Sequence, residues 1–208
     1  MAAPQRVVIG VDVGVAHLAF AAVAADAPHA LLDVAVVSIA AASGDDTVGA
    51  AIARLPAVLD GVAMLGDDAR VARYVIEQQP ASNPRMRIVS HAVQTYIATR
   101  HRGAAPRIAF QSARAKMRSA AALLGEPQLI GGGGAAPTTY GARKQAAVRA
   151  MTGYADVSDR ARFVIAALAK RDDAADAFLH ALHAATKLTN PPRNRRPRAT
   201  KAAAALAL

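Results

Sequence analysis

Four acidic residues stand where the surrounding pattern favours apolar or small side chains. Asp12 ends the β-branched segment VVIGV, and Glu77 ends the apolar segment RYVIE. Asp173 and Asp176 are three residues apart in a predicted helix, so they lie on one face of it. Carboxylates that converge repel one another unless a cation neutralises them. Hard oxygen ligands in a chain without Cys or a His triad indicate Mg²⁺, for which Mn²⁺ can substitute.

A pair of such ions is suited to phosphodiester hydrolysis, because one ion activates water while the other stabilises the leaving oxygen. The predicted metal ligands and catalytic acids are therefore Asp12, Glu77, Asp173 and Asp176. Each acid also has a simpler interpretation. Asp12 suits a turn, Glu77 suits an ion pair with Arg73, and an Asp pair at 172–173 suits a helix start, where the helix dipole favours acids.

The composition favours a polyanionic partner. The 208 residues include 20 Arg and five Lys against 13 Asp and only two Glu, which gives a net charge of +10. Because the chain has only two Glu residues, Glu77 is harder to explain as an ordinary residue without a function. The absence of Cys excludes a disulfide scaffold, a zinc finger and a thiol nucleophile. The 55 Ala residues are interpreted as small filler that suits helices and close packing.

The elements that must position the acids follow from the apolar periodicity. Strands are predicted over residues 7–11, 16–25, 30–42, 72–80 and 106–113, the first three as an antiparallel meander. Helices are predicted over residues 47–59 (interrupted at Pro56), 84–98 (capped by Asn83), 142–151, 158–171 and 172–188. This order indicates one α/β domain over residues 1–188 with a mixed sheet, a flexible glycine-rich loop at 131–134, and a basic, disordered tail over 189–208.

No segment is long and apolar enough to suggest a membrane span, and the N-terminus does not have the pattern of a secretory signal. A soluble intracellular protein is therefore expected.

Four segments together resemble a known family: VVIGVDVGVAHLAFA, RYVIEQQPASNPRM, YGARKQAAVRAM and KRDDAADAFLHAL. They are similar to the RuvC-type Holliday junction resolvases, and most of all to the branch of poxviruses and other large DNA viruses, which is related to the fungal mitochondrial resolvases. The resemblance extends from Val7 to about Leu182. It implies an RNase H-like fold with a mixed five-stranded sheet flanked by helices, and a homodimer that resolves four-way DNA junctions by Mg²⁺-dependent paired symmetric nicks during recombination or replication. For a viral protein, the expected place of action is the site of viral DNA replication in the host cell.

The resemblance also assigns roles to individual residues. It implies that the four acids are the metal ligands, with Asp172 as a secondary candidate, and that Lys144 stabilises charge at the scissile phosphate. It implies that the helix over 84–98 forms the dimer interface, although a plain core helix would have the same pattern. His180 and His183 are interpreted as core or surface residues rather than ligands.

A site that cuts DNA needs basic surroundings, because the acids would otherwise repel the phosphates. The predicted DNA-binding residues are Lys116, Arg114, Arg143, Gln78 and Arg85. Lys116 and Arg114 are equally consistent with a solvated loop, Gln78 (like Gln79) with a strand end, and His17 with either a substrate contact or a structural role.

Two other functions share most of these features. An RNase H-like nuclease that acts on other branched or hybrid substrates would use the same acids. A non-catalytic protein that recognises junctions by their shape is disfavoured, because a binder gains nothing from acids that repel phosphate.

Overall fold

The computed structural model describes residues 5–40, 47–66, 70–100, 107–130 and 139–190. The predicted glycine-rich loop and nearly all of the predicted basic tail lie outside these residues. The helix predicted over residues 47–59 is capped at Thr47, whose hydroxyl accepts a hydrogen bond from the backbone amide of Ala50.

A five-stranded mixed sheet forms the centre of the structure, in the order β3-β2-β1-β4-β5. Its first three strands form the predicted antiparallel meander, and β4 and β5 run parallel to β1. The strands are β1 (Val7–Val13), β2 (His17–Ala24), β3 (Leu31–Ser38), β4 (Val71–Glu77) and β5 (Ile108–Gln111). The carboxyl ends of β1, β4 and β5 therefore meet at one edge of the sheet, which is where an open α/β sheet usually places its site.

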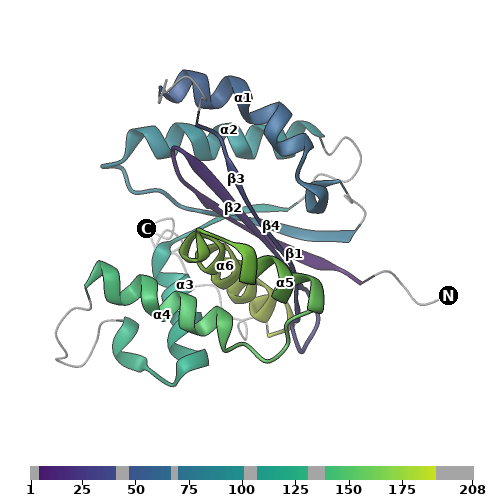
Figure 1. Cartoon of the computed structure of the whole chain (residues 1–208), viewed down its shortest axis with the longest axis vertical. Coiled ribbons are helices and arrows are strands. Elements are labelled where there is room, and N and C mark those ends of the chain that lie inside the picture. The colour runs from purple at the N-terminus through teal and green to yellow at the C-terminus, as the bar shows by residue number, and fades with distance from the viewer. Residues whose placement is uncertain (1–4, 41–46, 67–69, 101–106, 131–138, 191–208) are drawn as a thin grey trace, which may run out of the picture.

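Helices cover both faces of the sheet (Figure 1). On one face, α1 (Val48–Asp60) and α2 (Pro84–Arg100) pack on the sheet through one hydrophobic cluster. The other face carries α3 (Ala113–Leu124), α4 (Tyr140–Thr152), α5 (Asp159–Ala167) and α6 (Arg171–Thr189), which share a second cluster. Two short 3₁₀ turns, at Ala63–Leu65 and Pro127–Ile130, complete the described elements. The predicted α/β class and mixed five-stranded sheet are confirmed.

The helices differ from the sequence prediction in two ways. No helix was predicted directly after the fifth strand, but this segment forms α3, whose Ala-rich sequence has high intrinsic helix propensity. Pro56 was expected to interrupt the first helix, but α1 continues through it to Asp60. Leu55 and Leu59 on either side of Pro56 are buried in the core, and this packing offsets the cost of the proline.

The contact between α6 and β1 is unusually close. A Cβ atom added to Gly10 would lie 2.0 Å from the carbonyl oxygen of Ala177 and 2.8 Å from the amide nitrogen of Ala181. The backbones of α6 and β1 can approach this closely only because Gly10 has no side chain. Gly10 is two residues from Asp12, and Ala177 follows Asp176, so this contact brings two of the predicted acids together. Gly10 thus contributes to the positioning of the site.

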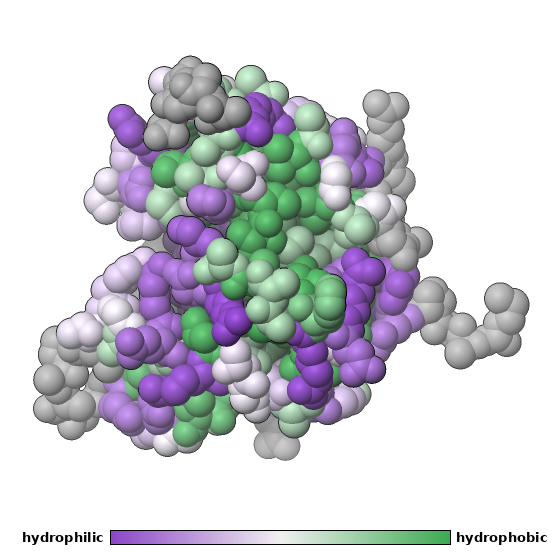
Figure 2. Space-filling view, viewed as in Figure 1, coloured by the Kyte–Doolittle hydropathy of each residue, from purple (hydrophilic) through white to green (hydrophobic). Residues whose placement is uncertain are grey.

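Hydrophobic side chains form a band through the middle of the view in Figure 2, and hydrophilic side chains flank it in the lower half. Most of the large apolar residues are buried, but Phe163 on α5 and Ile88 on α2 are exposed.

Among the described helices, none combines the length and hydropathy that a bilayer span requires.

Candidate active site

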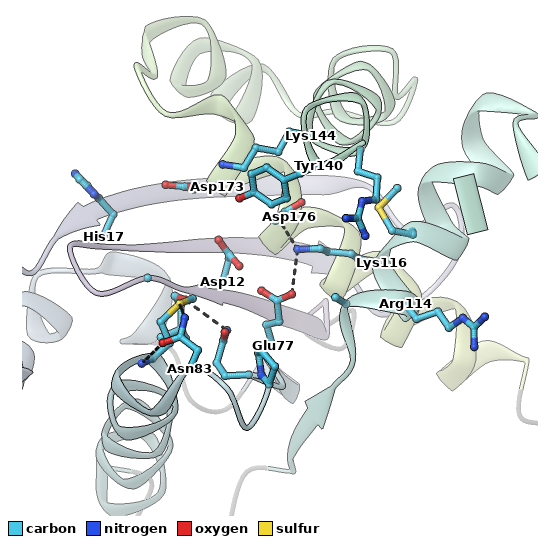
Figure 3. A pocket seen from close by; sticks show the side chains of 18 of the residues that line it. Asp12, His17, Glu77, Asn83, Arg114, Lys116, Tyr140, Lys144, Asp173 and Asp176 are labelled. Carbon is cyan, nitrogen blue, oxygen red and sulfur yellow. Dashed lines mark hydrogen bonds and ion pairs between the residues drawn. The ribbon is translucent and has the colours of Figure 1, made fainter. Parts of the chain in front are cut away.

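A cleft of about 890 Å³ opens at the carboxyl ends of β1 and β4. All four acids predicted from the sequence line it: Asp12, Glu77, Asp173 and Asp176. Its basic lining residues are Lys116, Lys144, Lys170, Arg114, Arg143 and His17. The volume is within the range of small-molecule and cofactor sites. Figure 3 shows the carboxylates of Asp12, Glu77 and Asp176 directed toward the same point of the cleft.

The amine of Lys116 occupies this point. Its Nζ atom lies 3.1 Å from Oε1 of Glu77 and 2.5 Å from Oδ2 of Asp176 (Figure 3). The three side chains are only 11%, 12% and 16% exposed, respectively, so water screens these ion pairs little. Arg73, which the sequence offered as a partner for Glu77, forms no such pair among the described residues. Lys116, expected at the DNA surface or in a solvated loop, is instead buried within the acidic cluster.

The acids influence one another's ionisation. Burial, together with the adjacent Glu77 carboxylate and the charge of Asp176, raises the pKa of Asp12 well above its usual range. Burial also raises the pKa of Asp176, although Lys116 opposes the shift. The pKa of Glu77 is lowered despite its burial, because His180, Asp12 and Lys116 stabilise its charged form. The pKa of Lys116 is raised, since the charges of the surrounding acids outweigh its burial.

Lys144 and Asp172 form a second ion pair at the rim of the cleft. The hydrogen bond from Lys144 to Asp172 raises the pKa of Lys144, and the ammonium also lies 5.3 Å from the centre of the Tyr140 ring. Asp172 and Asp173 both lie in the first turn of α6, where the helix dipole favours acids. Of these two acids, Asp172 pairs with Lys144, and Asp173 faces the cleft. Figure 3 shows Asp173 on the side of the cleft where Lys144 lies.

Two residues behind the acids were not selected as site candidates from the sequence, where His180 was interpreted as a core or surface residue. His180 is fully buried. Its Nε2 lies 3.8 Å from Oε1 of Glu77, and its Nδ1 lies 2.8 Å from the side-chain amide nitrogen of Gln111. The spacing of four residues between Asp176 and His180 is the signal that would have placed both on one helix face. Gln111 pairs with Glu77 in the register of β4 and β5, so parallel strand ends would have indicated it as well.

The remaining predicted residues divide into two groups. Arg114 and Arg143 line the cleft, although the Arg114 side chain is directed away from the acids in Figure 3. Gln78 lines a separate hollow beside α2, and Arg85 is exposed but lines neither of these cavities. Gln79, Asn83 and Tyr140 are cleft residues that the sequence did not select as primary candidates.

The four carboxylates of the cleft are the kind of ligand that a hard divalent cation prefers. Their combined negative charge is also larger than the single positive charge of Lys116 can neutralise. In the arrangement described for these parts of the chain, however, no three acidic or His side chains are disposed to hold one ion. The ammonium of Lys116 lies between two of the acids instead. With a cation at its centre, this arrangement could position a phosphate for attack by water.

Comparisons with known proteins identify the fold. No protein-family model matches the chain, and no curated protein matches it. Among solved structures, Thermus thermophilus RuvC in complex with a Holliday junction substrate has a TM-score of 0.54 at 15% identity, covering 89% of this chain and 96% of that one. The fowlpox virus resolvase, in complex with its substrate Holliday junction DNA, has a TM-score of 0.54 at 14% identity, covering 88% and 98%. The yeast mitochondrial Holliday junction resolvase Ydc2 has a TM-score of 0.56 at 14% identity, covering 90% and 82%.

These similarities confirm the RNase H-like fold that the sequence resemblance implied. All three proteins are Holliday junction resolvases, and two of them were solved with junction DNA. At 14–15% identity, the comparison bears on the architecture and not on individual residues.

Proposed function

We propose that this chain is a Mg²⁺-dependent endonuclease that resolves four-way DNA junctions. The observation that carries the proposal is the convergence of carboxylates from β1, β4 and α6 in one cleft that has basic residues around it. The shared fold of three Holliday junction resolvases supports the choice of substrate. A protein that only bound DNA would have no use for buried acids at the centre of a basic surface.

Asp12, Glu77, Asp173 and Asp176 would hold the divalent cations, for which Mn²⁺ could replace Mg²⁺. When bound, the cations supply the positive charge that neutralises the acids and polarises water and phosphate. The protein's own contribution is to hold the carboxylates on rigid strand and helix ends, and to limit the access of water through their burial.

The basic residues of the cleft would orient the DNA backbone. Arg143 and Lys144 lie on the first turns of α4, and Lys170 is adjacent to the start of α6, so these cations border the acids on one side. Lys144 is 34% exposed in its ion pair with Asp172, so it remains accessible to a phosphate. A phosphate bound there would gain a charged hydrogen bond without contacting the buried acids.

Paired nicking requires two such sites, and a homodimer would supply them with twofold symmetry that matches a four-way junction. The predicted interface is α2. Val89, Val93 and Ile97 of this helix pack into the core of the same chain, and Ile88 remains exposed for a partner. The viral branch is a prediction from the sequence motifs, since the bacterial, viral and mitochondrial structures are all similar at only 14–19% identity.

A substrate panel tests the proposal. The full chain, with Mg²⁺, is incubated with a mobile four-way junction, a flap and an RNA–DNA hybrid, and the cut positions on each strand are mapped. We expect nicks at symmetric positions on two opposing junction strands, and little cleavage of the other substrates. Cleavage of the flap or the hybrid instead would favour a nuclease of different specificity. Junction binding without cleavage in Mg²⁺ or Mn²⁺ would indicate a non-catalytic binder.

A further inference from the structure

Lys116 is placed where a lysine is costly. It lies near the N-terminus of α3, where the helix dipole disfavours a cation, and the residue is only 9% exposed. Both costs are offset by its contacts with Glu77 and Asp176, whose oxygens lie 3.1 Å and 2.5 Å from Nζ. The amine therefore replaces the charge that a cation would otherwise bring to this part of the cleft.

The geometry of a lysine bridge differs from that of a metal bridge. Mg²⁺ binds carboxylate oxygens at about 2.0–2.1 Å and requires nearly octahedral geometry, whereas an ammonium accepts longer and less directional contacts. This difference agrees with the finding that no three acidic or His side chains in the described segments are disposed to hold one ion. The bridge uses Oε1 of Glu77 and Oδ2 of Asp176, so a metal that needs either of these oxygens must compete with Lys116 for it.

We propose that Lys116 is a built-in competitor of the divalent cation: its ammonium bridges Glu77 and Asp176 while the metal is absent, and it leaves this bridge when the metal binds. The inference rests on the proposed metal site and adds an exchange between two cations to it. Lys116 has a flexible side chain of four methylene groups, and it lines the open cleft, so the amine has space to move. A phosphate of the bound DNA is the acceptor that the released amine would contact.

The exchange prevents two unfavourable states. Without Lys116 and without metal, Glu77 and Asp176 would be close, buried and unneutralised. With Lys116 fixed and metal present, two cations would compete for the same oxygens. A mobile lysine keeps one positive charge between these acids at each stage, so the metal-free protein retains its fold while the affinity for the first metal ion is lowered.

Calorimetric titration of the DNA-free full chain with Mn²⁺ tests the proposal. Lys116→Met should bind the first Mn²⁺ about tenfold more tightly than the wild type, because it removes a charged hydrogen-bonding competitor. Lys116→Arg, which keeps the charge, should bind no more tightly than the wild type. Lys187→Met is the matched control, since it removes an exposed lysine of α6 outside the cleft. Equal or weaker binding by Lys116→Met would overturn the proposal and show that Lys116 only organises the acids.

A measurement on the wild type avoids any effect of Lys116→Met on folding. The side-chain NMR signals of Lys116, assigned with Lys116→Arg, should shift as Mg²⁺ is added, whereas those of Lys187 should not. An unchanged Lys116 signal at Mg²⁺ concentrations that calorimetry shows to be saturating would overturn the exchange but leave the metal site intact. Failure of both the wild type and Lys116→Met to bind Mn²⁺ would overturn the metal site as well, and with it the proposed function.

Discussion

Nε2 of His180 lies 3.8 Å from Oε1 of Glu77, on a ring that is fully buried behind the cleft. Nδ1 of this ring is 2.8 Å from the amide nitrogen of Gln111, which also approaches the carbonyl oxygen of His180. An amide that donates to Nδ1 leaves the imidazole proton on Nε2, which faces the carboxylate. At this distance Nε2 has no hydrogen-bond partner among the described residues. We expect it to donate to Glu77 when a bound cation fixes the carboxylate, in the way that groups behind a metal site commonly orient its ligands.

Replacing His180 tests this role through metal affinity. His180→Leu should weaken Mn²⁺ binding by about tenfold or more, because Glu77 loses its polar support. His180→Gln should restore part of the affinity, since its side-chain amide offers the carboxylate a donor as well. Calorimetry measures both, with His183→Gln as the control from the same helix outside the cleft. Equal affinities in all three variants would contradict the role of His180.

Asp12→Asn should stabilise the metal-free protein at neutral pH. Burial and the neighbouring acids raise the pKa of Asp12, so ionising it in the folded chain is unfavourable, and an amide removes that cost. We expect the melting temperature to rise by about 2–4 °C, which corresponds to about 1 kcal/mol for a chain of this size. Asp156→Asn, at an exposed position, should leave it unchanged. A lower melting temperature for Asp12→Asn would show that the carboxyl group is structurally required.

The same shift predicts how stability depends on pH. An acid whose pKa is higher in the folded chain binds more protons there than in the unfolded chain between the two values, so stability falls as the pH rises through that interval. Asp12 therefore contributes to the free energy of unfolding at pH values below its usual pKa of 3.8, and this contribution is lost as the pH rises above that value. The stabilisation by Asp12→Asn should grow over that interval and shrink when Mg²⁺ is added. Denaturant titrations at several pH values, with and without Mg²⁺, measure both trends, and a benefit that is independent of pH would contradict them.

Gly10→Ala should destabilise the fold strongly. The added Cβ would overlap the backbone of α6 at Ala177, and neither backbone can move without disturbing the core. We expect a loss of about 3 kcal/mol or more in the free energy of unfolding. Gly49→Ala is the control, because an added Cβ there meets no atom within 4 Å. Equal stability of the two variants would mean that α6 and β1 are not as close as described.

Lys144→Met tests whether the lysine that pairs with Asp172 also takes part in cleavage. If its exposed ammonium stabilises charge on the phosphate, the single-turnover cleavage rate should fall by about tenfold or more. Junction affinity should change less, since many other basic residues contribute to it. Lys187→Met again serves as the charge-matched control. An unchanged rate would restrict Lys144 to its structural pair with Asp172.

The sequence was sufficient to predict the sheet and where the acids lie on it, because the short apolar runs beside Asp12 and Glu77 indicate strands without tertiary information. The same holds for the pair Asp173 and Asp176, whose helical spacing fixes their common face. The order of the parallel strands then brings their carboxyl ends together.

The role of Lys116 could not be predicted in this way. Its segment is rich in Ala and basic residues and has few large apolar side chains, so α3 was missed and Lys116 was assigned to the DNA surface. Its contacts with Glu77 and Asp176 join residues that are far apart in the chain, and only the tertiary structure brings them together. The close packing of Gly10 on α6 was also invisible, because an isolated glycine in a strand has several explanations.

The acids of this cleft are proposed to cut DNA with the help of a divalent cation. The most direct measurement compares cleavage of a four-way junction in Mg²⁺ by the wild type, Asp176→Asn and Asp156→Asn, with junction binding measured in parallel. We predict that Asp176→Asn binds the junction with little loss of affinity but cuts it at least a hundredfold more slowly, or about 3 kcal/mol in activation free energy, whereas Asp156→Asn cuts normally. Cleavage by Asp176→Asn at the wild-type rate would contradict the claim.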